Sequence, residues 1–337
     1  AFPQPKGQRP GCGFPVIRLV ALFCWSSGGL WKRMADSLKV GELAMFRRLY
    51  DDLERGTVVL GDRYFGSYYD LCLWKERGHD GVFRRHQRCP TDLRCGQRLG
   101  PQDHLVVWTK PNLPPRGVTP PQWSSVPETL TVRHVRRVVE VPGFRSRRLD
   151  LVTTLGDPQA YHADKPAELY RDRWMVELNL RSLKTTLKME TLRCKSVEMV
   201  RKELLMYQLA YNLIRLLMWE AARKHGGQVR RLSFAGTQQR LLALWPYWDR
   251  CHEVSQRRRL ADWLLEQIAA DPPSADPPAP TASNPAASNA DPKTTAASRV
   301  PAQKPGGEPI VPLLSYMPFG TATVLGQCLG EPRAVRE

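Results

Sequence analysis

The segment FPVIRLVALFCW, residues 14–25, gives the first indication of the fold. It is a nearly continuous apolar run, and such a run bounded by turn residues is typical of a strand buried inside a sheet. The residues SSGG at 26–29 end the run in a turn, and a shorter segment over residues 30–38 follows. The sequence therefore predicts a buried strand with a hairpin partner.

Helix and strand patterns alternate after this hairpin. The sequence predicts a helix over 41–56, a strand over 57–60, a helix over 65–77 and a strand over 81–85. Gly56 stands where a left-handed C-cap would end the first of these helices. Asp62 follows the strand TVVL at its carboxyl end, the edge of an open α/β sheet where ligands and catalytic groups collect. An Asx-type turn after a strand explains this aspartate equally well.

Residues 87–156 have a different pattern, in which Pro-rich turns separate segments of β-type composition. We interpret them as a β-rich insertion. Residues 81–148 carry 13 Arg and Lys against four acidic residues, a net charge of +9 that includes Arg84 and Arg85. Arginine dominance favours bidentate phosphate contacts. Trp108 and Trp123 lie among these cations; either could stack on an unpaired base, although packing is the more common role.

The second half of the chain is predicted to be helical up to residue 270. Two long helices are expected over about 163–190 and 196–224, and shorter ones near 237–244 and 256–270. Ser196 is the expected N-cap of the second long helix, which we interpret as a core helix. The composition then changes to Pro, Ala, Ser, Asn and Thr, which predicts a disordered linker over 271–309. Residues 310–337 show no period and receive no assignment.

Composition narrows the classes of function. The 337 residues carry 50 Lys and Arg against 33 Asp and Glu, and the resulting charge of +17 indicates a polyanionic partner such as nucleic acid. No RRM, KH or zinc-knuckle pattern occurs, which disfavours a general RNA-binding protein. The apolar runs are too short or too interrupted to span a bilayer. Eight cysteines without a CxxC pattern favour a reduced, cytosolic setting.

One helix face carries groups suited to phosphoryl transfer. Tyr170, Arg173, Glu177 and Lys184 stand at i, i+3, i+7 and i+14, and Arg181 and Lys188 extend the series. A carboxylate between cations could hold a divalent metal while the cations bind phosphates. Spacing by itself favours a plainer explanation, a solvated face on which Glu177 pairs with Arg173 and Arg181.

The same four residues match the series tyrosine, two residues, arginine, three residues, glutamate, six residues, lysine. The chain therefore resembles the DDE transposases of bacterial insertion sequences, in the insertion-sequence-four branch marked by this Y-R-E-K motif. The surrounding LYRDRWMVELNLRSLKTTLKMETLRCKS and the earlier VVLGDRYFGSYYDL are also similar to that family. The resemblance extends from residue 1 to about 225.

The resemblance implies an RNase H-like α/β fold with a β-strand insertion before the helix that bears the glutamate. On that basis the RNase H-like core is expected in two parts, residues 1–86 and 157–225. Between them lies the basic insertion 87–156, and behind them a helical extension over 226–270, the linker 271–309 and the tail 310–337.

The resemblance also implies site roles. Asp62 would be the second acidic residue of the catalytic triad and Glu177 the third, together holding two divalent metals, usually Mg²⁺. Tyr170, Arg173 and Lys184 would contact phosphates near the element's end, and Arg181, Lys188, Arg84 and Arg85 are further candidates for DNA binding. The expected partner is double-stranded DNA at element ends and target, bound by a homodimer in a synaptic complex at the cytoplasmic nucleoid.

The sequence departs from this pattern at the first aspartate of the triad. The family places it just upstream of the segment that matches AFPQPKGQRPGCGFP, whereas the first acidic residue here is Asp36 and the first residue is Ala1. We therefore expect an N-terminally truncated copy whose incomplete ligand set does not cleave DNA. Two hypotheses remain, a metal-dependent transposase and a non-catalytic DNA-binding remnant of one.

Overall fold

The computed structural model describes most of the chain. The described residues are 2, 15–86, 89, 92–139, 147–271 and 323–328. None of the helices in these ranges combines the length and apolar character needed to cross a bilayer.

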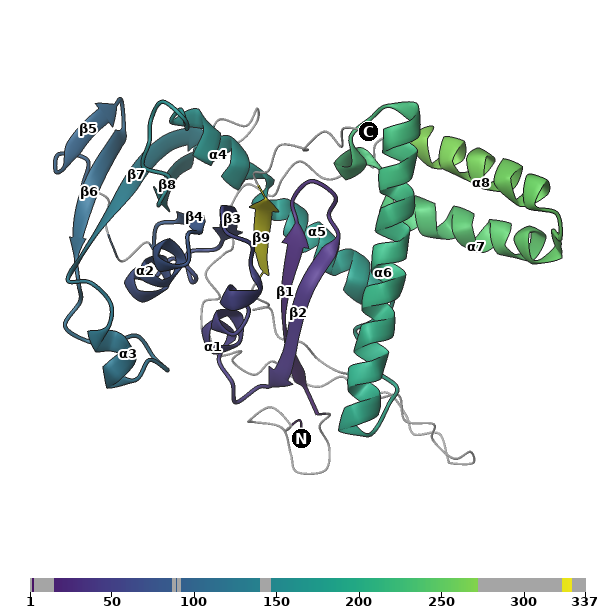
Figure 1. Cartoon of the computed structure of the whole chain (residues 1–337), viewed down its shortest axis with the longest axis horizontal. Helices are drawn as coiled ribbons and strands as arrows, with labels where there is room; N and C mark the ends of the chain where they lie inside the picture. Colours follow the sequence, from purple (N-terminus) through teal and green to yellow (C-terminus); the bar gives the residue numbers. More distant parts are fainter. Residues whose placement is uncertain are drawn as a thin grey trace, which may run out of the picture.

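The structure contains one mixed sheet flanked by helices (Figure 1). The strands are β1 (Ile17–Cys24), β2 (Leu30–Ser37), β3 (Thr57–Gly61), β4 (Asp80–Arg84), β5 (Gln97–Gly100), β6 (Asp103–Thr109), β7 (Thr129–Val139), β8 (Arg147–Thr153) and β9 (Thr323–Cys328). Their order across the sheet is β2-β1-β9-β3-β4-β8-β7-β6-β5. The helices are α1 (Glu42–Arg47), α2 (Tyr68–Glu76), α3 (Pro120–Ser124), α4 (Asp164–Arg171), α5 (Met175–Arg181), α6 (Val197–His225), α7 (Phe234–Arg250) and α8 (Val254–Ala269).

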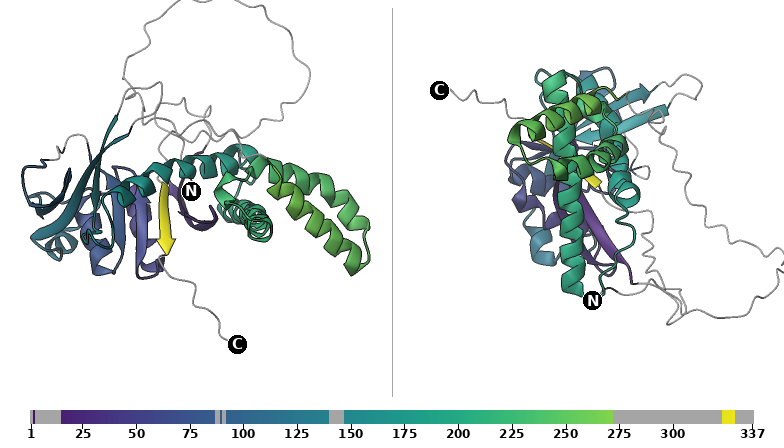
Figure 2. Two further views of the ribbon diagram at one scale, coloured as in Figure 1. Left: turned by 90° about the horizontal axis from the view of Figure 1, so that it is seen from above. Right: turned by 90° about the vertical axis from the view of Figure 1, so that its right-hand side faces the viewer.

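The predicted hairpin is confirmed, and its buried strand divides the core in two. β1 pairs with β2 in antiparallel register. Leu19 and Ala21 pack into the cluster formed with α4, α5 and α6. Val20 and Leu22, which point the other way along the pleat, pack with α1 and α2. The chain therefore forms three layers, a sheet with helices on both faces, as Figure 2 shows from above.

The strands expected as an insertion continue this sheet. β8 pairs with β4 and β7 in antiparallel register, and β6 and β5 follow at the outer edge. Between β6 and β7, Arg133 and Asp103 form a buried bidentate ion pair with N to O distances of 2.8 and 2.6 Å. Arg133 also donates to the carbonyl of Tyr161 at 2.7 Å, which ties these strands to the segment before α4.

The C-terminal stretch without a sequence assignment contributes β9. This strand lies between β1 and β3, parallel to β1 and antiparallel to β3. Its neighbour β3 is parallel to β4, so the carboxyl ends of β3 and β4 share one edge of the sheet. Except for Asp271, the predicted linker 271–309 lies outside the described residues.

Two predicted helices differ from the structure. The helix expected over 41–56 ends at Arg47 and is followed by a separate 3₁₀ turn, in which Tyr50 donates a hydrogen bond to Asp70 at 3.0 Å. The helix expected over 163–190 is interrupted by a 3₁₀ turn over 172–174 and changes to a π-helix over 182–186. Lys188 adopts a left-handed φ of 60° just after it.

The prediction of a core helix is right for only one side of α6. Ser196 caps it as expected by accepting a hydrogen bond from the Met199 N–H at 3.3 Å. The inner side is buried and includes Tyr211 and Arg215, but the outer side carries exposed Met and Leu. Its polar residue Asn212 points toward the sheet and exchanges two hydrogen bonds with the backbone of Leu30.

Candidate active site

Asp62 lies at the sheet edge where the carboxyl ends of β3 and β4 meet. Its side chain is 52% exposed, and its Oδ1 accepts a hydrogen bond from the Arg63 N–H at 2.6 Å. Arg84 ends β4 at the same edge. Both features suggested by the sequence, the short interior strand and the carboxylate after it, are present in the structure.

Glu177 is in the first turn of α5. Its carboxylate is 54% exposed, and its Oε1 accepts a hydrogen bond from Arg173 Nη2 at 2.7 Å. This is the i, i+4 ion pair that the plainer explanation of the sequence called for. The partner cation, however, is largely buried, with a side chain only 25% exposed.

Tyr170 and Arg173 connect the two carboxylates. The pKa of the Tyr170 phenol is raised to about 12, chiefly by burial and in smaller part by Asp62, while Arg173, Arg84 and Arg63 act to lower it. Burial lowers the pKa of the Arg173 guanidinium, but Tyr170, Glu177 and Asp62 together raise it above its ordinary value. One guanidinium is thus within electrostatic reach of both carboxylates, although they are far apart in the sequence. We call Asp62, Arg63, Arg84, Tyr170, Arg173 and Glu177 the carboxylate cluster.

The other predicted cations, Lys184, Arg181 and Lys188, come further along the chain. Lys184 belongs to the π-helix, so its offset from Tyr170 is not that of a regular helix. Burial lowers the pKa of its ammonium, against a smaller effect of Glu190. Arg181 and Lys188 are exposed beside it. The first three residues of the motif contact one another in sequence order, with Arg173 over the Tyr170 ring and bonded to Glu177.

Arg85 points into the packing of the outer strands. Its guanidinium lies 4.2 Å from the centroid of the Trp108 ring, and burial lowers its pKa. Trp108 donates from Nε1 to His134 Nε2 at 3.0 Å, and Trp123 packs against Tyr68. Both tryptophans contact the core cluster of α1 and α2, which supports packing over base stacking.

Several arginines in the basic segment are committed to ion pairs. Arg133 is fully buried against Asp103, Arg136 binds Asp150 at 2.5 Å, Arg137 binds Asp164 at 2.7 Å and Arg94 binds Asp92 at 3.0 Å. The net charge of this segment therefore overstates the number of cations available to phosphates. Arg133 in particular is a structural residue.

Sequence reasoning missed two contributors near the cluster. Arg63 follows Asp62 directly, and that adjacency was the available signal. Arg215 on α6 donates to Asn179 on α5 and to the hydroxyl of Tyr211 at 3.0 Å. It ties the helix that bears Glu177 to α6, and no local pattern could have indicated a contact between helices.

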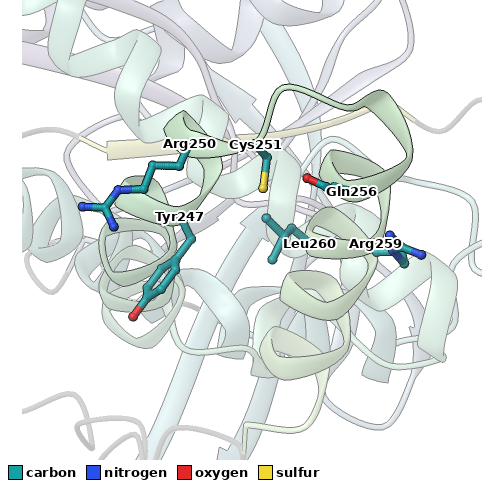
Figure 3. Close-up of a pocket in the computed structure, with 6 residues that line it drawn as sticks. All are labelled: Tyr247, Arg250, Cys251, Gln256, Arg259 and Leu260. Carbon is teal, nitrogen blue, oxygen red and sulfur yellow. The ribbon is translucent and has the colours of Figure 1, made fainter.

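A separate shallow hollow lies where α7 turns into α8, at the end of these helices farthest from the sheet (Figures 1 and 3). Tyr247, Arg250, Cys251, Gln256, Arg259 and Leu260 line it. No carboxylate lines this hollow, and it lies away from the sheet edge where β3 and β4 end. The carboxylate cluster is therefore the candidate active site.

Comparison with known proteins identifies the family of this chain. The family model described as a transposase DDE domain matches residues 5–213. The chain belongs to this family. It is also 27% identical over 245 residues to the transposase InsG for insertion sequence element IS4 of Escherichia coli (strain K12), a match that covers 70% of this chain. The chain spans about half (52%) of the length of that relative. The resemblance derived from the Y-R-E-K motif is confirmed.

Chemistry in the DDE family depends on a divalent metal. Asp62 and Glu177 offer half-exposed oxygen ligands, which suit a hard cation. Yet no group of three or more His, Cys, Asp or Glu that could hold a metal occurs within the described ranges. In addition, Arg173 already occupies Oε1 of Glu177. The described residues thus fit part of a metal site and do not complete one.

Proposed function

We propose that this chain is a DDE transposase with an RNase H-like core that acts on the DNA ends of an insertion sequence. The supporting observation is the carboxylate cluster, in which Arg173 interacts with both Asp62 and Glu177. The reaction class would be metal-dependent phosphodiester cleavage and strand transfer, with Mg²⁺ as the metal. Such a protein would work in the cytoplasm, at the nucleoid.

Each member of the cluster has a role in this proposal. Asp62 and Glu177 would hold Mg²⁺ through their exposed oxygens. Arg173 would bind phosphate through guanidinium donors beyond the one that Glu177 uses. Tyr170, whose raised pKa keeps its hydroxyl protonated, would donate a hydrogen bond to a phosphate oxygen. Arg84 would add positive charge at the same edge, and Lys184, Arg181 and Lys188 would follow the DNA along the chain.

Within the part of the chain that the structure describes, the cluster offers two carboxylates, which supports a second candidate function. Two ligands give Mg²⁺ fewer protein oxygens than a triad, and an in-line reaction needs near-ideal coordination. A chain with this site would retain the cationic surface for DNA and cleave slowly or not at all. It would then act as a DNA-binding remnant that engages DNA without cutting it.

The two candidates separate in one pair of measurements. Nicking of supercoiled plasmid would be followed with about 5 mM Mg²⁺, enough to fill a weak site. Binding to a fluorescent DNA duplex would be measured by anisotropy with Ca²⁺. Asp62→Asn and Glu177→Gln are the test variants, and Glu76→Gln, another exposed helix carboxylate, is the matched control.

Nicking that Glu76→Gln keeps and the two test variants lose would establish transposase chemistry in this chain. DNA binding without nicking in the unaltered chain would establish the remnant. Absence of both activities, in a chain that is folded by circular dichroism, would refute the proposal.

A further inference from the structure

Arg215 on α6 is a buried cation, 6% exposed, and among the described residues it binds no carboxylate. Its hydrogen bonds go to neutral acceptors, the side-chain oxygen of Asn179 and the hydroxyl of Tyr211. Its guanidinium also lies over the rings of Tyr211 and Phe234. Taking a guanidinium out of water is costly, and no opposite charge offsets this cost here. The cation therefore has a role that packing alone does not explain.

Arg215 and its partners connect three parts of the structure. The Tyr211 hydroxyl donates to the carbonyl of Gly28 at 2.7 Å, in the turn between β1 and β2. Gly28 has a φ of +68°, and a Cβ at this position would lie 3.0 Å from Cζ of Arg215, so the turn packs directly on the guanidinium. Arg215 Nη2 donates to Asn179 on α5. Because α6 and the turn hold the guanidinium, its bond to Asn179 fixes α5 relative to both.

α5 is a short helix between two irregular turns. It has seven residues, with a 3₁₀ turn over 172–174 before it and a π-helix over 182–186 after it. A helix this short has few backbone hydrogen bonds of its own, so tertiary contacts decide how it is rotated about its axis. Burial of its apolar side chains is non-directional. The hydrogen bond from Arg215 to Asn179 is directional and therefore specifies one rotation.

Glu177 and Asn179 point to opposite sides of α5. They are two residues apart, which is about 200° around a helix. Their exposure agrees with this geometry, since the Glu177 carboxylate is 54% exposed and Asn179 is 1% exposed. A rotation that carried Asn179 away from Arg215 would also carry Glu177 away from Arg173, which precedes α5 in the 3₁₀ turn. The direction of Glu177 thus depends on the buried bond on the far side of its helix.

We propose that Arg215 is a positioning residue for the carboxylate cluster, which holds Asn179 and so fixes the direction in which Glu177 points. The inference rests on the proposed function, because it concerns the same site. It adds two residues, Arg215 and Asn179, that lie outside the cluster and act through the helix. A pair with a structural role only would stabilise the whole fold, whereas a positioning pair affects α5 in particular.

The test uses four variants of the full chain. Asn179→Leu removes the acceptor, and Arg215→Met/Asn179→Leu replaces the buried polar pair by apolar side chains, a change that is often neutral for stability. Asn179→Asp keeps an acceptor oxygen for Arg215. Asn212→Leu is the matched control, because Asn212 lies three residues before Arg215 on the same helix but bonds to the backbone of Leu30 instead of α5.

Hydrogen exchange followed by mass spectrometry reports on α5 without DNA or metal. In Asn179→Leu and in Arg215→Met/Asn179→Leu, the amides of α5 should exchange at least ~10-fold faster, while those of β3 and β4 keep their rates. Asn179→Asp and Asn212→Leu should leave exchange in α5 unchanged. If Asn179→Leu does not fold, the double variant decides.

Three results of the exchange experiment would overturn the inference. They are unchanged exchange in α5, equal acceleration in α5 and the sheet, and loss of folding in the double variant. In the first case the pair does not fix α5, and in the other two it supports the whole fold instead of one helix.

Plasmid nicking separates this inference from the proposed function. In a chain that nicks DNA, Arg215→Met/Asn179→Leu should need at least ~10-fold more Mg²⁺ for half-maximal rate, because groups that orient a metal ligand affect metal affinity by this much. Asn179→Asp should keep the Mg²⁺ requirement of the unaltered chain. An equal requirement in the double variant would contradict the positioning role. If the unaltered chain does not nick DNA, transposase chemistry fails, and exchange in α5 still decides the inference.

Discussion

Acid should destabilise this protein through His134. This histidine lies on β7 with 3% of its surface exposed, and its Nε2 accepts a hydrogen bond from Trp108 Nε1 at 3.0 Å. The pKa of His134 is lowered from 6.5 to about 4, chiefly by burial and then by Arg85 and His104, against an opposing effect of Asp150. The folded protein therefore keeps this imidazole neutral.

The sign of the pH dependence follows from proton binding. Between pH 6.5 and about 4 the unfolded chain binds a proton at this site that the folded chain does not. The contribution to stability is thus complete above pH 6.5 and is lost as the pH falls toward 4. A difference of this size corresponds to roughly 3 kcal/mol, most of which is lost by pH 4.5.

Urea unfolding at pH 7.5 and pH 4.5 would measure the effect. Carboxylates also titrate in this range, so the informative quantity is the difference between the unaltered chain and His134→Gln, which keeps an acceptor for Trp108 but cannot ionise. His252→Gln, at an exposed histidine, is the control. Equal losses of stability in the unaltered chain and His134→Gln, within about 0.5 kcal/mol, would refute the reasoning.

Three further predictions concern the ion pairs and the carboxylate cluster. Asp103→Asn should cost about 3–5 kcal/mol in urea unfolding, because Arg133 would keep a buried charge without its partner; a loss under 1 kcal/mol would show that this pair is hydrated. Arg173→Gln should weaken duplex binding by about tenfold, and should lower the slope of log affinity against log salt by about 0.9 if the guanidinium contacts one phosphate. An unchanged slope in anisotropy titrations would exclude that contact. Tyr170 should stabilise the fold fully below pH 10 and lose this contribution as the pH rises toward 12. Unfolding at pH 8.5 and 11 should then show a smaller alkaline loss for Tyr170→Phe, and equal losses would contradict the buried phenol.

The sequence determined those features that depend on neighbours in the chain. The apolar run before the SSGG turn specified a buried strand and its hairpin, because a continuous apolar segment of that length must be covered on both sides. The spacing of Tyr170, Arg173 and Glu177 indicated three residues that interact, since i+3 and i+4 neighbours meet on any helix. The same spacing, with Lys184, pointed to the transposase DDE family.

Interactions between residues far apart in the sequence depend on the tertiary structure. Asp62 influences the pKa of the Arg173 guanidinium that binds Glu177, because β3 and β4 are parallel and α4 and α5 pack against the sheet. Arg133 and Arg85 were indistinguishable from other cations in the sequence, yet one is buried against Asp103 and the other against Trp108.

The place of β9 in the sheet and the exposure of the outer face of α6 also depend on the tertiary structure. β9 is held between β1 and β3 by backbone hydrogen bonds, and those with β1 join residues about 300 positions apart in the sequence. The outer face of α6 looked like core in the sequence because its residues are apolar, and only the arrangement of the other elements left it exposed. Local patterns report the conformation of a segment, whereas partners and burial depend on which segments the fold brings together.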